Sequence, residues 1–275
     1  MAEAIKTMKL YAGVERVFNE LRELGIADSD PVQVEDLVKF DQYHYEGVEA
    51  VEQAIKTCNI TATHQVLEVG SGIGGPSRYL AHTAGCHLTA LELQADLNFV
   101  GSQLTERCNL SDQVRHLQGD ILQGHPGGGD FDTLVSWLVF LHIPDRATLF
   151  TRCFEALKPG GMMFIEDFSK RGEFTSQETA LLENKIYCHY VPTMQTYLEQ
   201  VSGAGFVDIV AEDMTEPWTR FVRTRSDAFR EAKTRHIRVN GEAVYYGLEE
   251  FYNAMTTLYE GGNLGGLRLV ARKPG

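Results

Sequence analysis

The sequence predicts an α/β fold of the Rossmann-like class, with a seven-stranded sheet, a helical lid from the N-terminus and a C-terminal insertion. Three observations predict it. From residue 65 onward, short apolar segments alternate with helical ones, which is the pattern of a parallel sheet with crossover helices. A glycine-rich turn at residues 70–75 follows the first strand, at the edge where such folds bind ligands. The 275 residues suffice for one such domain with an elaborated cap.

Strands are expected where short runs rich in Val, Ile, Leu and Phe lie between turn residues, and helices where apolar residues recur three or four positions apart. The turn Leu157–Gly161 should end the helix before it, because Pro and Gly stop helices. The expected strands are Val66–Val69, His87–Leu91, Val114–Gln118, Phe131–Ser136, Met162–Glu166, Phe206–Ala211 and Leu267–Arg272. The expected helices are Tyr11–Leu24, Val48–Lys56, Pro76–Thr83, Asp96–Cys108, Ala147–Leu157, Glu178–Tyr190, Met194–Ser202, Trp218–Val239 and Val244–Tyr259.

The chain is expected to divide into a helical lid and a main domain. Residues 1–57 precede the first strand and form the lid, which contains the aromatic cluster Phe40–Tyr45. Residues 58–275 form the Rossmann-like domain, with a helical cap inserted at about 170–260. We expect the lid and the cap to lie over the carboxyl edge of the sheet, where open α/β folds bind ligands.

Charge and hydropathy restrict the class of partner. The formal net charge is −13, which opposes binding to a phosphate backbone. No apolar run reaches the roughly 20 residues that span a bilayer, and the N-terminus lacks the apolar core of a secretory signal. We therefore expect a cytoplasmic protein that acts on a small molecule, with no nucleic-acid or membrane partner. Arginines gather between residues 220 and 238, either as a solvated helix face or as a site for an anionic group.

The cysteines and histidines suggest neither disulfides nor a metal site. The five cysteines are scattered, odd in number and form no CxxC pair, which fits a reducing compartment. No HExxH or similar metal-ligand spacing occurs, so no metal is implied. The cysteines are Cys58, Cys86, Cys108, Cys153 and Cys188.

The glycine-rich turn predicts a nucleotide-like ligand. Gly70, Gly72 and Gly75 match GxGxxG, and glycines let a ligand approach the backbone closely. A dinucleotide site must therefore be weighed against other adenosyl ligands. Glu92 ends the second strand, where a carboxylate can accept hydrogen bonds from both ribose hydroxyls in either case. Asp120 follows the third strand, where it can accept from an adenine amino group.

This succession, together with Asp130-Phe131-Asp132 and LKPGG before the fifth strand, resembles the class I S-adenosylmethionine-dependent methyltransferases over residues 65–167. The resemblance implies S-adenosyl-L-methionine as the cofactor, S-adenosyl-L-homocysteine as its product, and a small-molecule methyl acceptor. It assigns cofactor binding to Glu68, Gly70, Ser71, Gly72, Gly74, Glu92, Leu93, Asp120, Ile121, Ser136 and Trp137.

A closer resemblance is to the phosphoethanolamine and the sarcosine and dimethylglycine methyltransferases. It rests on GSGIGGPSRYL at residues 70–80, on the loop 136–142, and on LFTRCFEALKPGG after it. In that family a loop histidine works with a lid tyrosine, which makes His142 and Tyr43 the candidate catalytic pair. Trp137-Leu138 stands where the phosphoethanolamine enzymes have Arg-Asp, so an obvious partner for a cationic head group is missing.

The acceptor is left open among three classes. The resemblance favours N-methylation of a small amine or amino acid, whose proton His142 can accept near neutral pH. The missing acid and the many aromatics favour S-methylation of a small thioether acid, as in the methylthiohydroxybutyrate enzymes of sulfonium osmolyte synthesis, which needs no base. O- or C-methylation of a larger ring compound is the third class. Aromatic side chains can hold an onium charge, and the candidates for acceptor binding are Tyr45, Trp137, Tyr187 and Tyr190.

Overall fold

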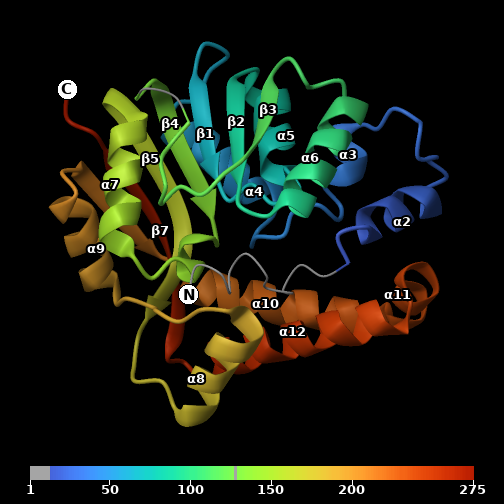
Figure 1. Ribbon diagram of the computed structural model, residues 1–275. Helices are drawn as coiled ribbons and strands as arrows, with labels where there is room; N and C mark the ends of the chain where they lie inside the picture. Colours follow the sequence, from blue (N-terminus) through green and yellow to red (C-terminus); the bar gives the residue numbers. More distant parts are fainter. Residues whose placement is uncertain (1–12, 127–128) are drawn as a thin grey trace.

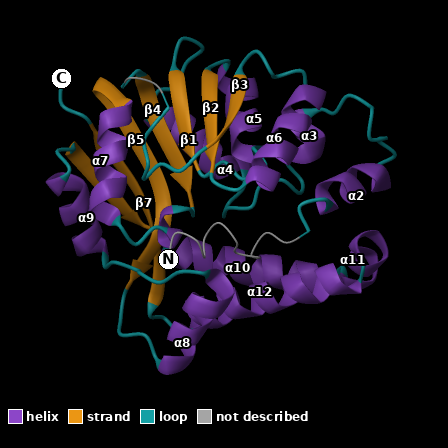
Figure 2. Cartoon of the chain, viewed as in Figure 1, coloured by secondary structure: helices purple, strands orange, loops and turns teal. Residues whose placement is uncertain are grey.

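A seven-stranded mixed sheet forms the centre of the computed structural model, which describes residues 13–126 and 129–275. The strand order is β3-β2-β1-β4-β5-β7-β6. The first five strands run parallel, while β7 is antiparallel to both of its neighbours. This arrangement confirms the predicted fold class (Figure 2). The strands are β1 (Gln65–Val69), β2 (His87–Glu92), β3 (Val114–Gln118), β4 (Phe131–Trp137), β5 (Leu157–Lys170), β6 (Val207–Asp213) and β7 (Leu264–Arg272).

Helices cover both faces of the sheet because each buried strand carries apolar side chains on both sides. Neighbouring residues of β1 separate in this way, with Val66 in the core under one pair of helices and Leu67 in the core under the other. Helices α4 (Val48–Thr57) and α5 (Gly75–Ala84) pack on the first face. Helices α7 (Arg146–Ala156) and α9 (Met194–Gly203) pack on the second.

The strands begin and end close to their expected positions, but the LKPGG segment differs. Helix α7 ends at Ala156, and Leu157 already pairs with Phe131 of β4. The register of β5 then shifts between Phe131 and Thr133, which accommodates the extra residues around Pro159. The predicted turn is therefore an irregular beginning of β5.

The N-terminal helices link the sheet to the C-terminal cap. Helix α2 (Arg16–Glu23) is shorter than the predicted one, and Tyr11 lies outside the described residues. One face of α2 packs on α6 (Ala95–Arg107) in a shared apolar cluster. Carboxylates of α2 pair with arginines of α11 (Lys233–Asn240). A short helix, α3 (Val34–Leu37), follows.

The cap is formed by helices that run beneath the carboxyl edge of the sheet, where α10 and α12 lie side by side (Figure 1). The predicted helix Trp218–Val239 is divided at Ala232 into α10 (Thr215–Glu231) and α11, which brings the arginines of α11 to α2. Helix α12 is Glu242–Glu260. Within the described residues, none of the helices has the length and apolar character needed to cross a bilayer.

The predicted helix Glu178–Tyr190 also ends early. It consists of α8 (Ser176–Leu181) and one π-helical turn, η2 (Leu182–Ile186). Tyr187 then adopts a left-handed conformation with φ 56°, which a helix cannot continue. Apolar spacing alone did not reveal this ending, because Tyr187 carries no conformational signal in the sequence.

Candidate functional site

The glycine turn lies between β1 and α5 and lines a cavity of about 330 Å³, named here the first cavity. Gly70 and Gly72 have φ angles of 75° and 55°, the left-handed region that glycine adopts at little cost. A Cβ on Gly70 would lie 2.4 Å from the Val139 side chain, so the turn has no room for one. Ser71 also lines the cavity, while Gly74 caps α5 and does not.

Glu92 stands at the end of β2 against the glycine turn. Its Oε2 accepts a hydrogen bond of 2.8 Å from the Gly72 amide, and its Oε1 accepts one of 2.8 Å from the Gln94 amide. Burial raises the pKa of this carboxyl, and the amide hydrogen bonds oppose that rise. Each carboxylate oxygen keeps a lone pair for a ligand. Glu92 is therefore fixed in position and still able to accept hydrogen bonds.

Glu68 lies deeper in the same wall and is protonated near neutral pH. Its side chain is buried, and the Ser77 hydroxyl hydrogen-bonds to it. Burial raises the pKa of Glu68 to about 8, although Ser77 and Arg78 lower it. Glu68 thus adds no full negative charge beside Glu92 at pH 7.

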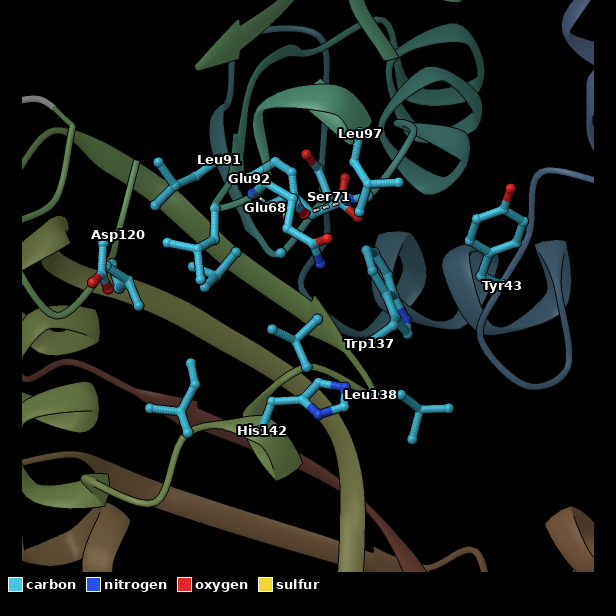
Figure 3. A pocket seen from close by; sticks show the side chains of 18 of the residues that line it. Tyr43, Glu68, Ser71, Leu91, Glu92, Leu97, Asp120, Trp137, Leu138 and His142 are labelled. Carbon is cyan, nitrogen blue, oxygen red and sulfur yellow. Dashed lines mark hydrogen bonds between the residues drawn. The ribbon is translucent and has the colours of Figure 1, made fainter. Parts of the chain in front are cut away.

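The far end of the first cavity is mainly apolar, with the half-buried carboxylate of Asp120 in its wall. Asp120 follows β3, and its Oδ1 accepts a 3.0 Å hydrogen bond from the Leu122 amide. In the view of Figure 3, Asp120 lies at one end of the cavity and Tyr43 at the other. The apolar side chains Ile73, Leu91, Leu93, Leu97, Ile121 and Leu122 line the space between them and Glu92.

The carboxyl end of β4 places Ser136 and Trp137, which the family resemblance assigned to the cofactor, in different surroundings. Ser136 is buried, donates to the Val69 carbonyl at 2.8 Å and does not line the cavity. Trp137 does line it, with its ring centroid 5.6 Å from that of His44. Ser136 therefore holds the end of β4 to β1, and Trp137 forms a wall of the cavity.

His142 ends the short helix η1 (Phe140–His142) and lies on the floor of the first cavity. Its Nδ1 lies 3.1 Å from the Tyr187 carbonyl oxygen. A carbonyl can only accept, so Nδ1 carries the proton and Nε2 keeps a free lone pair. Burial lowers the pKa of His142 to about 4, the Tyr187 carbonyl opposes this, and the charge of Arg146 adds to it. The imidazole is therefore neutral and fixed in one tautomer.

A second cavity of about 70 Å³ adjoins the first, and Tyr43, Leu138 and His142 line both. The fold thus brings together the two residues predicted as a catalytic pair, His142 from the sheet domain and Tyr43 from the lid. Tyr45 lines the second cavity too. Its remaining lining residues are Arg16, Leu141, Phe168, Ile186, Arg225, Leu248, Phe251, Tyr252 and Met255.

The predicted acceptor aromatics take different places. The Tyr45 ring packs edge-on against Trp218, with centroids 5.2 Å apart. Tyr187 and Tyr190 are not among the residues that line the two cavities. Tyr187 acts on the site through its carbonyl, and the Tyr190 hydroxyl accepts a 2.9 Å hydrogen bond from Gln200.

Sequence reasoning missed the residues that join the lid to the sheet domain. Asp41 lines the first cavity and forms a fully buried ion pair with Arg78 of α5, at 3.0 Å. Asp41 lies inside the aromatic cluster that the sequence singled out, so an acid amid aromatic residues was the available signal. No such signal marked Arg16, and Arg225 was one of six arginines at residues 220–238 that the sequence offered together as a site for an anionic group. Among the described residues, no cluster of His, Cys, Asp and Glu could hold a metal ion.

Comparison with known proteins identifies a domain that includes much of this site. The family model of a methyltransferase domain matches residues 66–161. Phosphoethanolamine N-methyltransferase 1 of Arabidopsis thaliana is 29% identical over 192 residues, which are 70% of this chain and 38% of that protein. The chain thus spans less than half of that relative's length. The sarcosine/dimethylglycine N-methyltransferase of Halorhodospira halochloris is 27% identical over 73% of this chain and 71% of that protein.

Solved structures share the fold over the whole chain. A phosphoethanolamine N-methyltransferase 2 of Haemonchus contortus, in complex with phosphomonomethylethanolamine and S-adenosylhomocysteine, matches with a TM-score of 0.83 and 19% identity, over 100% of this chain and 60% of that one. The [4+2]-cyclase SpnF matches with a TM-score of 0.72 and 15% identity, over 100% and 97% of the two chains. Because a cyclase has the same fold, the fold by itself does not define the reaction.

Proposed function

We propose that this chain, which carries a methyltransferase domain at residues 66–161, transfers a methyl group from S-adenosyl-L-methionine to the nitrogen of a small amine or amino-acid metabolite. One observation carries the proposal. The first cavity, built on the glycine turn, shares Tyr43, Leu138 and His142 with an adjoining second cavity, which would take the acceptor. The relatives named above, amine methyltransferases by name, support nitrogen as the acceptor atom.

The first cavity fits the proposed donor. Its volume of about 330 Å³ lies within the usual range of ligand sites, about 300–1,000 Å³. Glu92 would accept hydrogen bonds from the ribose hydroxyls, and Asp120 from the adenine amino group. The backbone of Gly70–Gly72 would face the amino-acid end, where side chains would block the approach. When bound, S-adenosyl-L-methionine supplies a methyl group already activated by its sulfonium sulfur.

The chain itself then has two tasks, orientation and proton removal. Holding two reactants in line contributes about 7–11 kcal/mol, so positioning supplies most of the catalysis. His142 Nε2 faces the junction of the two cavities with a free lone pair, where it can accept the proton of an amine. Tyr43 lines the same junction from the lid.

We also propose that residues 1–57 act as the lid of this site. The described part of the segment contributes Asp41, Tyr43 and His44 to the wall of the first cavity. The buried Asp41–Arg78 pair fixes the segment to α5. Closing the site excludes water, which strengthens every electrostatic interaction within it.

S-methylation of a small thioether acid is the second candidate. The described lining of the second cavity contains no carboxylate to balance an ammonium group. His142 is neutral, and a thioether needs no base. Both features favour an acceptor whose reacting atom is uncharged.

The test is a mass-spectrometric screen for methyl acceptance. Purified protein is incubated with S-adenosyl-L-methionine and a panel of small amines, N-methylated amino acids and thioether acids. We expect a mass gain of one methyl group on an amine or amino acid, with S-adenosyl-L-homocysteine formed in equal amount. Methylation of a thioether acid alone would favour the second candidate. Failure to bind S-adenosyl-L-homocysteine in calorimetry would contradict both.

A further inference from the structure

Two positively charged side chains line the second cavity, whose other described lining is mainly apolar and aromatic. Arg16 of α2 and Arg225 of α10 both line it, and its described lining includes no acid. The chain as a whole carries a net charge of −13, so acids are abundant elsewhere. Two guanidinium groups directed at one small cavity therefore need a separate explanation.

Arg225 differs from its neighbours in the arginine-rich stretch of the cap. The other five arginines each pair with a carboxylate, whereas Arg225 has no carboxylate within ion-pair distance among the described residues. Its Nη1 donates to the His44 carbonyl at 3.3 Å, and its guanidinium carbon lies 5.4 Å from the Tyr252 ring centroid. The five paired residues are Arg220, Arg223, Arg230, Arg235 and Arg238.

Arg16 is similar in this respect. Its guanidinium carbon lies 4.9 Å from the Tyr43 ring centroid, and the two side chains share a hydrogen bond. The nearest acid along α2, Glu20, is already held by Arg235 at 2.6 Å and by Asn240 at 2.9 Å. No described carboxylate forms an ion pair with Arg16. Among the described residues, its positive charge is balanced by aromatic partners and by the more distant Glu20.

The two arginines lie between the second cavity and an outer one, and Arg16 also contacts Tyr43 at the junction with the first cavity. Arg16, Arg225, Leu248 and Tyr252 also line an outer cavity of about 660 Å³, whereas His142 lines the first cavity. An acceptor with its reacting atom at His142 would therefore have its other end at the arginines. Guanidinium groups bind planar and tetrahedral oxyanions through paired hydrogen bonds.

We propose that Arg16 and Arg225 form an oxyanion subsite, which binds a carboxylate or phosphate group of the acceptor. The proposal rests on the proposed function and deepens it, because it defines the acceptor as an anionic or zwitterionic molecule. A cationic amine without an acid group is excluded as the preferred acceptor, since it would add a third positive charge beside two unpaired ones. The subsite is assembled from the lid and the cap, so it exists only when both are in place.

The experiment compares acceptors that differ only in the anionic group. Sarcosine is paired with N-methylethanolamine, phosphoethanolamine with ethanolamine, and 3-(methylthio)propanoate with 3-(methylthio)propanol. Binding is measured by calorimetry on the full chain, with and without S-adenosyl-L-homocysteine, and kcat and KM are measured wherever methyl transfer occurs. We expect the anionic member of at least one pair to bind about 10- to 100-fold more tightly than its neutral or cationic partner. A difference within the sarcosine or the methylthio pair would indicate a carboxylate subsite, and a difference within the phosphoethanolamine pair would indicate a phosphate subsite.

Variants test whether the two arginines are responsible. Arg16→Gln and Arg225→Gln should each weaken binding of the anionic acceptor, or raise its KM, about 10- to 100-fold. They should leave the neutral analogue and S-adenosyl-L-homocysteine unaffected. The matched controls are Arg22→Gln, on the same helix as Arg16, and Arg223→Gln, on the same helix as Arg225. Both control arginines are ion-paired and absent from the cavity, so no change is expected.

Two results would overturn the subsite. One is equal binding of the anionic and neutral members of every pair. The other is an anionic acceptor whose affinity does not change in either variant. A protein that fails to bind S-adenosyl-L-homocysteine would instead contradict the proposed methyl transfer. Acceptor binding measured without S-adenosyl-L-homocysteine tests the subsite independently of the proposed methyl transfer.

Discussion

The two cavities differ in how the chain builds them. The first cavity is formed mainly around the carboxyl ends of β1, β2, β3 and β4, with Glu68, Glu92 and Asp120 at or just after strand ends, and the lid adds Asp41, Tyr43 and His44. The second is formed by side chains from the lid, which includes α2, from Leu138 after β4, and from η1, β5, η2, α10 and α12, which are far apart in the sequence. Local geometry thus fixes the first cavity, while tertiary packing alone creates the second.

This difference indicates where specificity resides. A donor site built on adjacent turns can be kept while the lid and cap change, because few of its contacts depend on them. The acceptor site depends on contacts such as Arg235–Glu20 and Arg268–Glu46, which join segments more than 200 residues apart. Changes in the lid or cap are therefore expected to alter the acceptor more than the donor.

Loss of the imidazole at His142, which lines both cavities, is the largest effect that we expect, and it should act on the methyl-transfer step. If the acceptor is an amine, His142→Ala should lower kcat by about 10²–10⁴ because the proton loses its base. Raising the pH should then restore part of the rate, since more free amine is present. If the acceptor is a thioether, the loss should be smaller and no rescue should occur. Steady-state kinetics from pH 5 to 9 distinguish the two.

The wild-type profile provides a further check on His142. Its pKa of about 4 keeps the imidazole neutral throughout pH 5–9, so its own titration should not limit the rate in that range. His82→Ala, on the exposed side of α5, is the control and should leave the rate unchanged. A His142→Ala enzyme with an unchanged rate and pH profile would remove the catalytic role assigned to this residue.

The buried Asp41–Arg78 pair joins the lid to the sheet domain. Breaking it tests how strongly the stability of the protein depends on contact between the two. Asp41→Ala leaves the Arg78 guanidinium buried without its carboxylate, which should lower the free energy of unfolding by about 3–5 kcal/mol. Urea unfolding measures this change. Asp36→Ala removes a surface pair with Lys39 and should cost less than about 1 kcal/mol. Equal effects of both variants would contradict the structural role of Asp41.

The sequence predicted the first cavity in detail because its determinants are short-range. A strand followed by glycines sets the turn, and the end of the next strand sets Glu92, whose carboxylate does contact the Gly72 amide. Gly74 and Ser136, which the family resemblance assigned to the cofactor, are not among the lining residues, because Gly74 caps α5 and the Ser136 hydroxyl donates to the Val69 carbonyl.

The second cavity could be predicted only in part. His142 and Tyr43 came from the family resemblance, and the structure does bring both to it. Arg225 could not be separated from its five neighbours, because only the packing of α10 decides which arginine faces inward. The left-handed Tyr187, whose carbonyl holds His142, was concealed by helical spacing that continued past it.

The pH dependence of stability should report on Glu68, in the wall of the first cavity. Its folded-state pKa of about 8 lies above its unfolded value, so the stability it contributes is present at low pH and is lost as the pH rises through 8. Glu68→Gln keeps a neutral group there. The variant should therefore gain stability relative to the wild type between pH 5 and 8, by up to about 1.4 kcal/mol per pH unit.

Chemical denaturation at several pH values measures this difference, and other titrating groups cancel because both proteins contain them. Glu106→Gln, on the exposed side of α6, should show a constant difference from the wild type. If the Glu68→Gln difference were also constant, Glu68 would be ionised throughout and would add a full negative charge beside Glu92.

Glu92→Ala should give the smallest of these effects and act on the donor side alone. The carboxylate is expected to bind the ribose hydroxyls, and a hydrogen bond to a charged group contributes about 1.5–3 kcal/mol. Calorimetry should therefore show S-adenosyl-L-homocysteine bound about 10- to 150-fold more weakly than by the wild type.

At saturating donor, the acceptor KM of Glu92→Ala should be unchanged, because Glu92 lines only the first cavity. A raised acceptor KM would mean that the donor wall also shapes the second cavity, and the separation drawn between the two would be wrong. The same calorimetry with NAD should show no binding to the wild type. If the protein bound NAD and did not bind S-adenosyl-L-methionine, the glycine turn and Glu92 would instead form a dinucleotide site.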